Sequence, residues 1–410
     1  MPSSVGPNVK GEENLVFGYD LSDNYNSYIG EPATNSQAYG HSAMTQEGFD
    51  AWGCYDGTNS SPAYHSWDVA QSKTLVNIPG PYGRNVNAML YHNFTGGFHG
   101  PTHWSGIPGS ALTANTSIVV QGWVKAADAA SVGKTVTPYI YYYLSGGGSA
   151  SSSTNFTLTS QWQLVSHVHN ITTAGTSGIL YFFTGGGTNI KMYLTMTGAI
   201  PNKSHAVRWP AGGTTRSVTQ GLLDLTGNLT VDLTNVSFDS NAQMTFDGSN
   251  DYISIPNTTS YGNFTAEVVI KPTSNPNNAA SAISTEYPGT NSTVNFTIGF
   301  NGSNFKGGFY NDSSGGWHEI FTSLPTLNVY THYVLTYNGT QMVLYKNGTS
   351  VGTLNTTDIA AGGNPIRIGR RWDLAEYFPG DIDVAKVYDR ALTASEVKSN
   401  FNALKGRFNI

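Results

Sequence analysis

Short runs of alternating apolar and polar residues, separated by glycine, asparagine and serine turns, fill most of the chain. Runs such as TSIVVQGWVKA (116–126), TVTPYIYYYLS (135–145) and FTAEVVIKP (264–272) have the two-residue period and the β-branched and aromatic content of strands. Helical periodicity is confined to TASEVKSNFNALK (393–405), where a threonine cap is followed by Glu396. The pattern predicts an all-β protein of two antiparallel β-sandwiches in tandem, with a short C-terminal helix.

Breaks in this pattern divide the chain into four expected parts. An N-terminal arm is expected over residues 1–14 and a first sandwich over 15–198, within which residues 22–83 form a long irregular stretch. A segment rich in proline, glycine and charge, 199–216, is predicted to be a linker. The second sandwich is expected over 217–410.

The amino-acid composition excludes several classes of partner and an intramolecular disulfide. Charged residues make up 11 % of the chain, against roughly 25 % in an average globular protein, and the formal net charge is −6. Because no block of lysine or arginine is present, we expect neither a nucleic-acid partner nor attraction to an anionic membrane. No run of 18 apolar residues occurs, so no membrane insertion is expected. Cys54 is the only cysteine, which rules out an intramolecular disulfide.

The first twenty residues, MPSSVGPNVKGEENLVFGYD, contain neither a basic n-region nor an apolar h-region. They do not have the pattern of a signal peptide. We therefore expect the chain to be made in a cytoplasm without export.

Four ordered motifs in the second half resemble the laminin-G-like, concanavalin A-like jelly roll. They are MTFDGSNDYISIP (244–256), FTAEVVIKP with Val269 where tryptophan is usual, the hairpin THYVLTYNGTQMVLYKNGTSVG (331–352), and the closing stretch from IRIGRR to the helix at 393–405. The Asn-Gly turns of the hairpin bracket an alternating strand, which supports the same reading independently. The resemblance covers roughly residues 217–405 and implies a jelly-roll sandwich there.

A wider combination of segments resembles structural proteins of tailed bacteriophages. These segments are ENLVFGYDLSDNYNSYIGEPATN (13–35), GTTRSVTQGLLDLTGN (213–228) and NFNALKGRFNI (400–410). In such proteins a carbohydrate-binding-module-like jelly roll precedes a laminin-G-like domain, and the first sandwich resembles such a module loosely, through SIVVQGWVKA and SQWQLVSHVHN.

The phage resemblance implies a non-enzymatic virion protein: a fibre of the tail, neck or head, a spike, or a capsid decoration. Its implied partners are further copies of itself, commonly as a trimer or pentamer, other virion proteins, and glycans of the host surface. Two alternatives stay open. One is a purely architectural decoration without a ligand, and the other is a polysaccharide depolymerase, a glycosidase of concanavalin-like fold.

Asp381 and Asp383, in GDIDVAKVYDRALTASEV, bear on the enzymatic alternative. Alternate residues of a strand face the same side, so the two carboxylates share a face and resemble part of the Glu-x-Asp-x-x-Glu strand of laminarinase-type glycosidases. Retaining hydrolysis needs two carboxylates about 5 Å apart and a proton donor. The donor position here holds Ala385 and Lys386. We therefore interpret this segment as the closing strand of the sandwich, with Ile382, Val384 and Val387 mostly in its core, and expect no catalytic residues.

Calcium is the one metal that the resemblance suggests, because laminin-G-like domains often bind it through aspartates and backbone carbonyls. The candidate ligands are Asp247, Asp251, Asp381 and Asp383; the alternative is that they are ordinary turn aspartates. No other cofactor is expected. His167 and His169, which share a face of one strand, supply two imidazoles but no closed transition-metal site.

Aromatic residues near polar turns are the candidates for glycan binding. Rings stack on the apolar face of a pyranose, and neighbouring polar groups bond its hydroxyls. The candidates are Trp104, Tyr141 and Tyr143 in the first sandwich and Trp317 and Trp372 in the second. Each could instead be partly buried packing.

Overall fold

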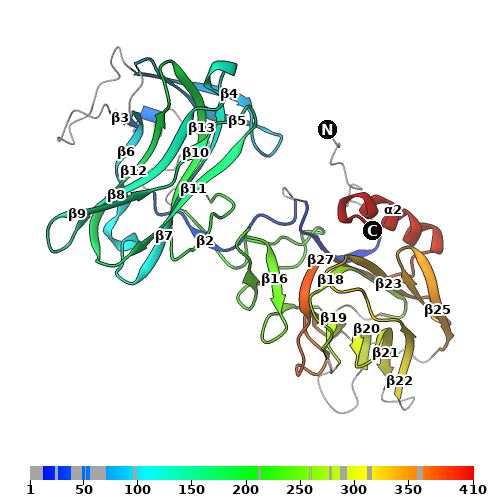
Figure 1. Cartoon of the computed structure of the whole chain (residues 1–410). Coiled ribbons are helices and arrows are strands. Elements are labelled where there is room, and N and C mark those ends of the chain that lie inside the picture. Colours follow the sequence, from blue (N-terminus) through cyan, green and yellow to red (C-terminus); the bar gives the residue numbers. More distant parts are fainter. Residues whose placement is uncertain are drawn as a thin grey trace. The chain divides into compact units, whose positions relative to one another are not determined.

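The computed structural model describes residues 13–23, 26–37, 49–50, 52–55, 71–95, 99–210, 214–257, 259, 261–276, 279–286, 293–311, 316–357 and 363–410. Within these ranges the protein consists of antiparallel sheets with a helix near the C-terminus, which confirms the all-β prediction (Figure 1). The chain forms two compact units. The inserted sandwich comprises residues 32–217 and 240–242; the C-terminal sandwich comprises the described residues up to Glu31, together with 218–239 and 243–410.

The inserted sandwich packs two main sheets around one core. Its described strands pair in the orders β10-β8-β12-β6-β3, with β9 beside β8, and β11-β7-β13-β5-β4; β2 pairs β14 separately. The bounds are β2 Ala33–Thr34, β3 Gly53–Tyr55, β4 Gln71–Pro79, β5 Asn85–Asn93, β6 Gly100–Pro108, β7 Thr116–Ala126, β8 Thr135–Leu144, β9 Ser149–Ser153, β10 Phe156–Thr157, β11 Gln163–Ile171, β12 Gly175–Gly185, β13 Ile190–Pro201 and β14 Thr215–Arg216, with short 3-10 turns η1 Gly109–Ala111 and η2 Ala129–Ser131. Alternate residues of β8, such as Ile140 and Tyr142, enter the core, and the residues between them face outward.

The C-terminal sandwich is a concanavalin-like jelly roll. In the part of the chain that the structure describes, one sheet runs β15-β16-β27-β18-β23-β24-β25 with β1 also paired to β27, and the other runs β17-β26-β19-β20-β21-β22. The bounds are β1 Leu15–Asp20, β15 Ser237–Phe238, β16 Met244–Asp247, β17 Ile253–Ile255, β18 Phe264–Pro272, β19 Ser281–Thr285, β20 Thr293–Asn301, β21 Asn304–Asn311, β22 Gly316–Thr322, β23 Thr331–Tyr337, β24 Gln341–Lys346, β25 Thr349–Asn355, β26 Ile366–Ile368 and β27 Pro379–Tyr388. The predicted hairpin is β24–β25, with Asn347 and Gly348 at positive φ in its turn.

Helix α2 (Ala394–Phe408) lies on the outer face of the larger sheet of this sandwich (Figure 1). Thr393 caps it and forms the predicted capping box with Glu396. Beneath the helix, the fully buried Glu267 accepts hydrogen bonds from His332 Nε2 at 2.8 Å and Asn400 Nδ2 at 2.9 Å. No helix in the described ranges is long and apolar enough to cross a membrane.

The first strand belongs to a different unit from the one that its place in the chain suggests. We expected residues 15–198 to form one sandwich, but β1 pairs with β27, with Leu15 opposite Tyr388, and buries Phe17 and Tyr19 completely in the C-terminal core. The physical reason is that β27 offers an open ladder edge beside the short β16. Residues 32–217 are therefore an insertion within the C-terminal sandwich, not a unit that precedes it.

The expected linker, 199–216, is also largely part of a folded unit. Strand β13 continues to Pro201, and β14 pairs with β2. Trp209 Nε1 donates to the carbonyl of Thr197 at 2.7 Å, and Gln121 exchanges two hydrogen bonds with the backbone of Val207. The described part of this stretch, 199–210 and 214–216, is thus a packed return segment rather than a free connection.

Candidate functional site

Two of the tryptophans singled out by the sequence meet on the outer face of the six-stranded sheet of the C-terminal sandwich. Trp317 is the second residue of β22 and lies directly opposite Tyr310 of β21, and Trp372 follows β26. The centroid of the Trp317 ring lies 5.1 Å from that of Trp372 and 5.2 Å from that of Tyr310. All three side chains are partly exposed, and we call them the tryptophan cluster. Because Phe309 points into the core, the pleat of β21 turns Tyr310 to the outer face.

Charged groups border the tryptophan cluster, and each of them is paired. Lys306 Nζ lies 4.4 Å from the centroid of the Trp317 ring and forms an ion pair with Glu319. The Arg371 guanidinium lies 5.5 Å from the Trp372 ring and donates from Nε to Asp373 Oδ1 at 2.6 Å. This hydrogen bond raises the pKa of Arg371. The result is an aromatic surface with a polar rim and little net charge, which suits stacking on a sugar ring and bonding of its hydroxyls.

Sequence reasoning missed the charged rim of this cluster. Lys306 and Tyr310 are four residues apart on one strand, so the two-residue period places them on the same face. That signal was available for β21. The approach of Trp372 to Trp317 was not, because it depends on the packing of segments 55 positions apart in the sequence.

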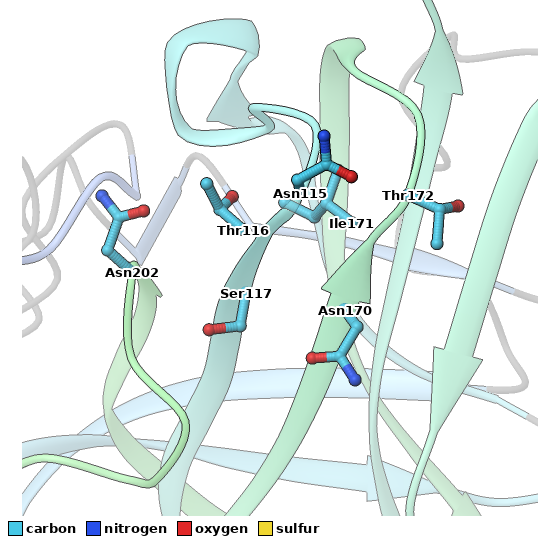
Figure 2. Close-up of a pocket in the computed structure, with 7 residues that line it drawn as sticks. All are labelled: Asn115, Thr116, Ser117, Asn170, Ile171, Thr172 and Asn202. Atoms are coloured by element: carbon cyan, nitrogen blue, oxygen red, sulfur yellow. The ribbon is translucent and has the colours of Figure 1, made fainter.

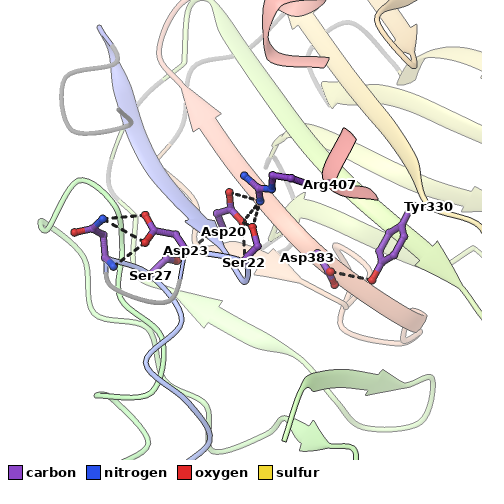
Figure 3. A network of polar contacts seen from close by, with 8 residues as sticks. Asp20, Ser22, Asp23, Ser27, Tyr330, Asp383 and Arg407 are labelled. Carbon is purple, nitrogen blue, oxygen red and sulfur yellow. Dashed lines mark hydrogen bonds and ion pairs between the residues drawn. The ribbon is translucent and has the colours of Figure 1, made fainter. Parts of the chain in front are cut away.

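Asp381 and Asp383 both face the α2 side of β27, but each already has a partner. Asp381 forms an ion pair with Lys271, and Asp383 Oδ2 accepts from Tyr330 Oη at 2.9 Å (Figure 3). A β-bulge at Asp383 skips it in the register with β18, so Ile382 enters the main core while Val384 turns toward the helix. Period-two alternation would place Val384 in the main core with Ile382. Because of the bulge, Val384 instead packs beneath the helix.

The surroundings of Asp383 are crowded with carboxylates. Asp20, at the end of β1, accepts two hydrogen bonds from Arg407 Nη2 at 2.5 and 2.7 Å (Figure 3). Burial, aided by the charge of Asp381, raises the pKa of Asp383 to about 6, while the hydrogen bond from Tyr330 opposes the rise. A raised pKa beside an ionised carboxylate occurs in acid–base pairs, but these carboxylates are tied to Lys271 and Tyr330 within the fold.

The four aspartates expected to bind calcium do not gather into one group. Asp251 accepts from Ser237 Oγ at 3.0 Å and from the backbone N–H of Asp247 at 2.8 Å. Asp247 accepts from two N–H groups of its own turn. No group of three or more His, Cys, Asp or Glu side chains among the described residues is arranged to hold a metal ion. A calcium site at these aspartates therefore stays a prediction.

In the inserted sandwich, Tyr141 and Tyr143 share the outer face of β8, as predicted, with ring centroids 5.3 Å apart. Trp104 lies within β6, but its side chain is outside the described residues. His167 and His169 both contact Ser152 Oγ, at 2.6 and 2.5 Å, so the two imidazoles bridge β11 and β9 through a hydroxyl. Burial lowers the pKa of both histidines.

An open polar depression of about 530 Å³ lies at one end of the inserted sandwich, where β7 begins and β11 ends (Figure 2). Its lining is composed of asparagine, threonine and serine with one isoleucine: Asn115, Thr116, Ser117, Asn170, Ile171, Thr172 and Asn202. It contains neither an aromatic nor a charged side chain. None of the residues proposed from the sequence lies there.

Comparison with known proteins agrees with the fold of the C-terminal sandwich. Residues 247–398, less than half of the chain, match the laminin G-type family model described as the concanavalin A-like lectin/glucanases superfamily. That description includes both lectins and enzymes. No curated protein matched the chain.

Several solved structures are similar at low scores. One is the binding domain of botulinum neurotoxin serotype D, with 14 % identity and a TM-score of 0.37 over 45 % of this chain and 49 % of that chain. Another is the botulinum neurotoxin type G receptor-binding domain, with 18 % identity and a TM-score of 0.35 over 45 % of this chain and 48 % of that chain. A third is the binding domain of Paraclostridial Mosquitocidal Protein 1, with 21 % identity and a TM-score of 0.35 over 44 % of this chain and 49 % of that chain. The chain matches about half the length of each of these structures.

Proposed function

We propose that this chain is a non-enzymatic structural protein of a tailed-phage virion that binds host-surface glycans through the tryptophan cluster. The observation that carries the glycan part is the meeting of Trp317, Trp372 and Tyr310 on one outer sheet face. Aromatic rings with polar neighbours are the usual lining of a small-molecule site. The paired ions at the rim favour a neutral or weakly charged sugar over a strongly anionic one.

The non-enzymatic part rests on the state of Asp381 and Asp383. The ion pair with Lys271 and the hydrogen bond from Tyr330 occupy these carboxylates, and they lie on the sheet that α2 packs against rather than beside the tryptophan cluster. The depolymerase alternative would need them free to protonate a glycosidic oxygen and to attack the sugar.

The virion part rests on the sequence segments that resemble phage structural proteins. Such proteins assemble from copies of themselves and with other virion proteins, so we propose a homo-oligomer, a trimer or a pentamer. An architectural decoration without a ligand is the alternative that the tryptophan cluster argues against.

Glycan-array binding of the full chain tests the ligand. The variant Trp317→Ala/Trp372→Ala is expected to lose signal at least tenfold, since aromatic contacts contribute about 0.5–1.5 kcal/mol each beyond their buried area. Phe321→Ala, which removes an exposed ring of the same strand, is the matched control. Equal binding by the double variant and the wild type would refute the site. Antibody labelling of particles purified from a lysate that contains the chain tests the virion assignment, and unlabelled particles would refute it.

A further inference from the structure

A second ordered surface lies on the inserted sandwich, on the outer face of the sheet that contains β8. Strand β8 is flanked by β9 and β12, and directly opposed residues of paired strands present their side chains on the same face. Three parallel rows result. They are Ser149, Ser151 and Ser153 on β9; Tyr143, Tyr141 and Tyr139 on β8; and Ser177, Ile179 and Tyr181 on β12.

The central tyrosine row is supported from one side. Tyr139 makes edge-on contacts with the rings of Tyr181 and Phe183, at centroid distances of 5.5 and 5.3 Å. Tyr181 and Phe183 are buried, whereas Tyr143 at the other end of the row is 41 % exposed. At one end of the row, the Tyr139 ring packs against neighbouring rings, and at the other end the Tyr143 ring is exposed. The row spans about 14 Å, since a strand rises by about 3.4 Å per residue.

Five hydroxyls of this face, those of Tyr141, Tyr143 and the β9 serine row, bond to no described residue. On the inner side of the same strands the opposite holds, because Ser152 Oγ is engaged by His167 and His169. The outer hydroxyls thus remain available as donors and acceptors.

We propose that this face, the tyrosine–serine face, binds an extended, uncharged polysaccharide chain along β8. The rings of Tyr141 and Tyr143 supply rigid amphipathic contact area, and the serine row beside them supplies adaptable hydrogen bonding. None of the nine residues in the three rows is an aspartate, glutamate, histidine, lysine or arginine, which matches an uncharged ligand. The open part of this face, along β8 and β9, has a repeating step, which suits a chain of several sugar units better than a chain end, for which an enclosed pocket would be needed.

This inference does not rest on the tryptophan cluster, and separate variants distinguish the two. The full-length chain is run in native gels containing dextran, laminarin or galactomannan, and its retardation gives the affinity for each polymer. Retardation in at least one gel is expected, with at least a tenfold loss for Tyr141→Ala/Tyr143→Ala and little loss for Tyr141→Phe, which keeps the ring. Tyr193→Ala, on the outer face of the other sheet, is the matched control.

Trp317→Ala/Trp372→Ala should leave this retardation unchanged, even where it abolishes binding on the glycan array. Oligosaccharides prepared from the same polymer should compete better as they lengthen. No retardation in any gel, an unaffected double tyrosine variant, or competition by the monosaccharide as strong as by the polymer would each overturn the proposal. It would also be overturned if the double tyrosine variant dissociates an oligomer while no polymer binds, since the face would then join copies of the chain.

Discussion

Replacement of Asp383 by asparagine should stabilise the C-terminal sandwich at neutral pH and have little effect at acidic pH. The pKa of this carboxyl rises from 3.8 to about 6 in the folded protein, with burial as the main cause. Its ionised form is therefore disfavoured in the folded state relative to the unfolded chain. Stability is unaffected by this group below about pH 4, falls as the pH rises toward 6, and stays reduced above it.

The magnitude follows from the size of the shift. About two pKa units at 1.36 kcal/mol each give a ceiling of about 3 kcal/mol for the penalty at pH 8. Asparagine keeps an acceptor for Tyr330 Oη but adds an amide N–H that must find a partner, which costs about 1–3 kcal/mol if it finds none. We expect a net gain of about 1–2 kcal/mol, or a rise in Tm of about 2–8 °C for a unit of this size.

Differential scanning calorimetry between pH 4 and pH 8 measures this change. The two units can unfold separately, so the C-terminal transition is first identified with a destabilised variant of that sandwich. Asp389→Asn, an exposed aspartate just after the same strand, is the control and should not reproduce the gain. A loss of stability at pH 8, or an equal gain at pH 4 and pH 8, would refute the reasoning. A polysaccharide-degrading activity that Asp383→Asn or Asp381→Asn abolishes would overturn the non-enzymatic assignment.

Two further predictions concern the architecture. A fragment of residues 217–410 lacks β1 and should show no cooperative melt by circular dichroism, whereas a chain in which a short Gly/Ser linker replaces 32–217 should melt cooperatively. In that shortened chain, Phe17→Ala should lower the free energy of unfolding by about 3–5 kcal/mol. A stable 217–410 fragment would contradict the assigned role of β1. Glu267→Ala should destabilise the C-terminal sandwich by about 3–5 kcal/mol in urea titrations, because it removes the carboxylate that faces the buried Lys386. A change below about 1 kcal/mol would mean that the buried interactions of Glu267 contribute little to stability.

The sequence predicted local features well because their signals are local. The capping box at Thr393, the hairpin turn at Asn347 and the shared face of Tyr141 and Tyr143 each depend on spacings of at most a few residues. Strand β4 was missed within the irregular stretch, since its polar sequence QSKTLVNIP shows little alternation.

Features that depend on distant pairing could not be predicted in this way. The run LVFGYD was recognised as a strand, but nothing in it specifies a partner more than 360 positions away. The same holds for the contact of Trp317 with Trp372. The bulge at Asp383 likewise has no marker in GDIDVAKVYD, and it alone decides that Val384 faces the helix rather than the main core.

The position of β1 has a consequence for how the chain is made. Leu15 pairs with Tyr388, so at a synthesis rate of about 5–20 residues per second the two strands leave the ribosome roughly 20–75 s apart. During that interval the inserted sandwich is fully synthesised and can fold. The core into which Phe17 and Tyr19 pack has not yet formed. The C-terminal sandwich can close only once β27 has left the ribosome, so the apolar side chains of β1 are open to premature association until then.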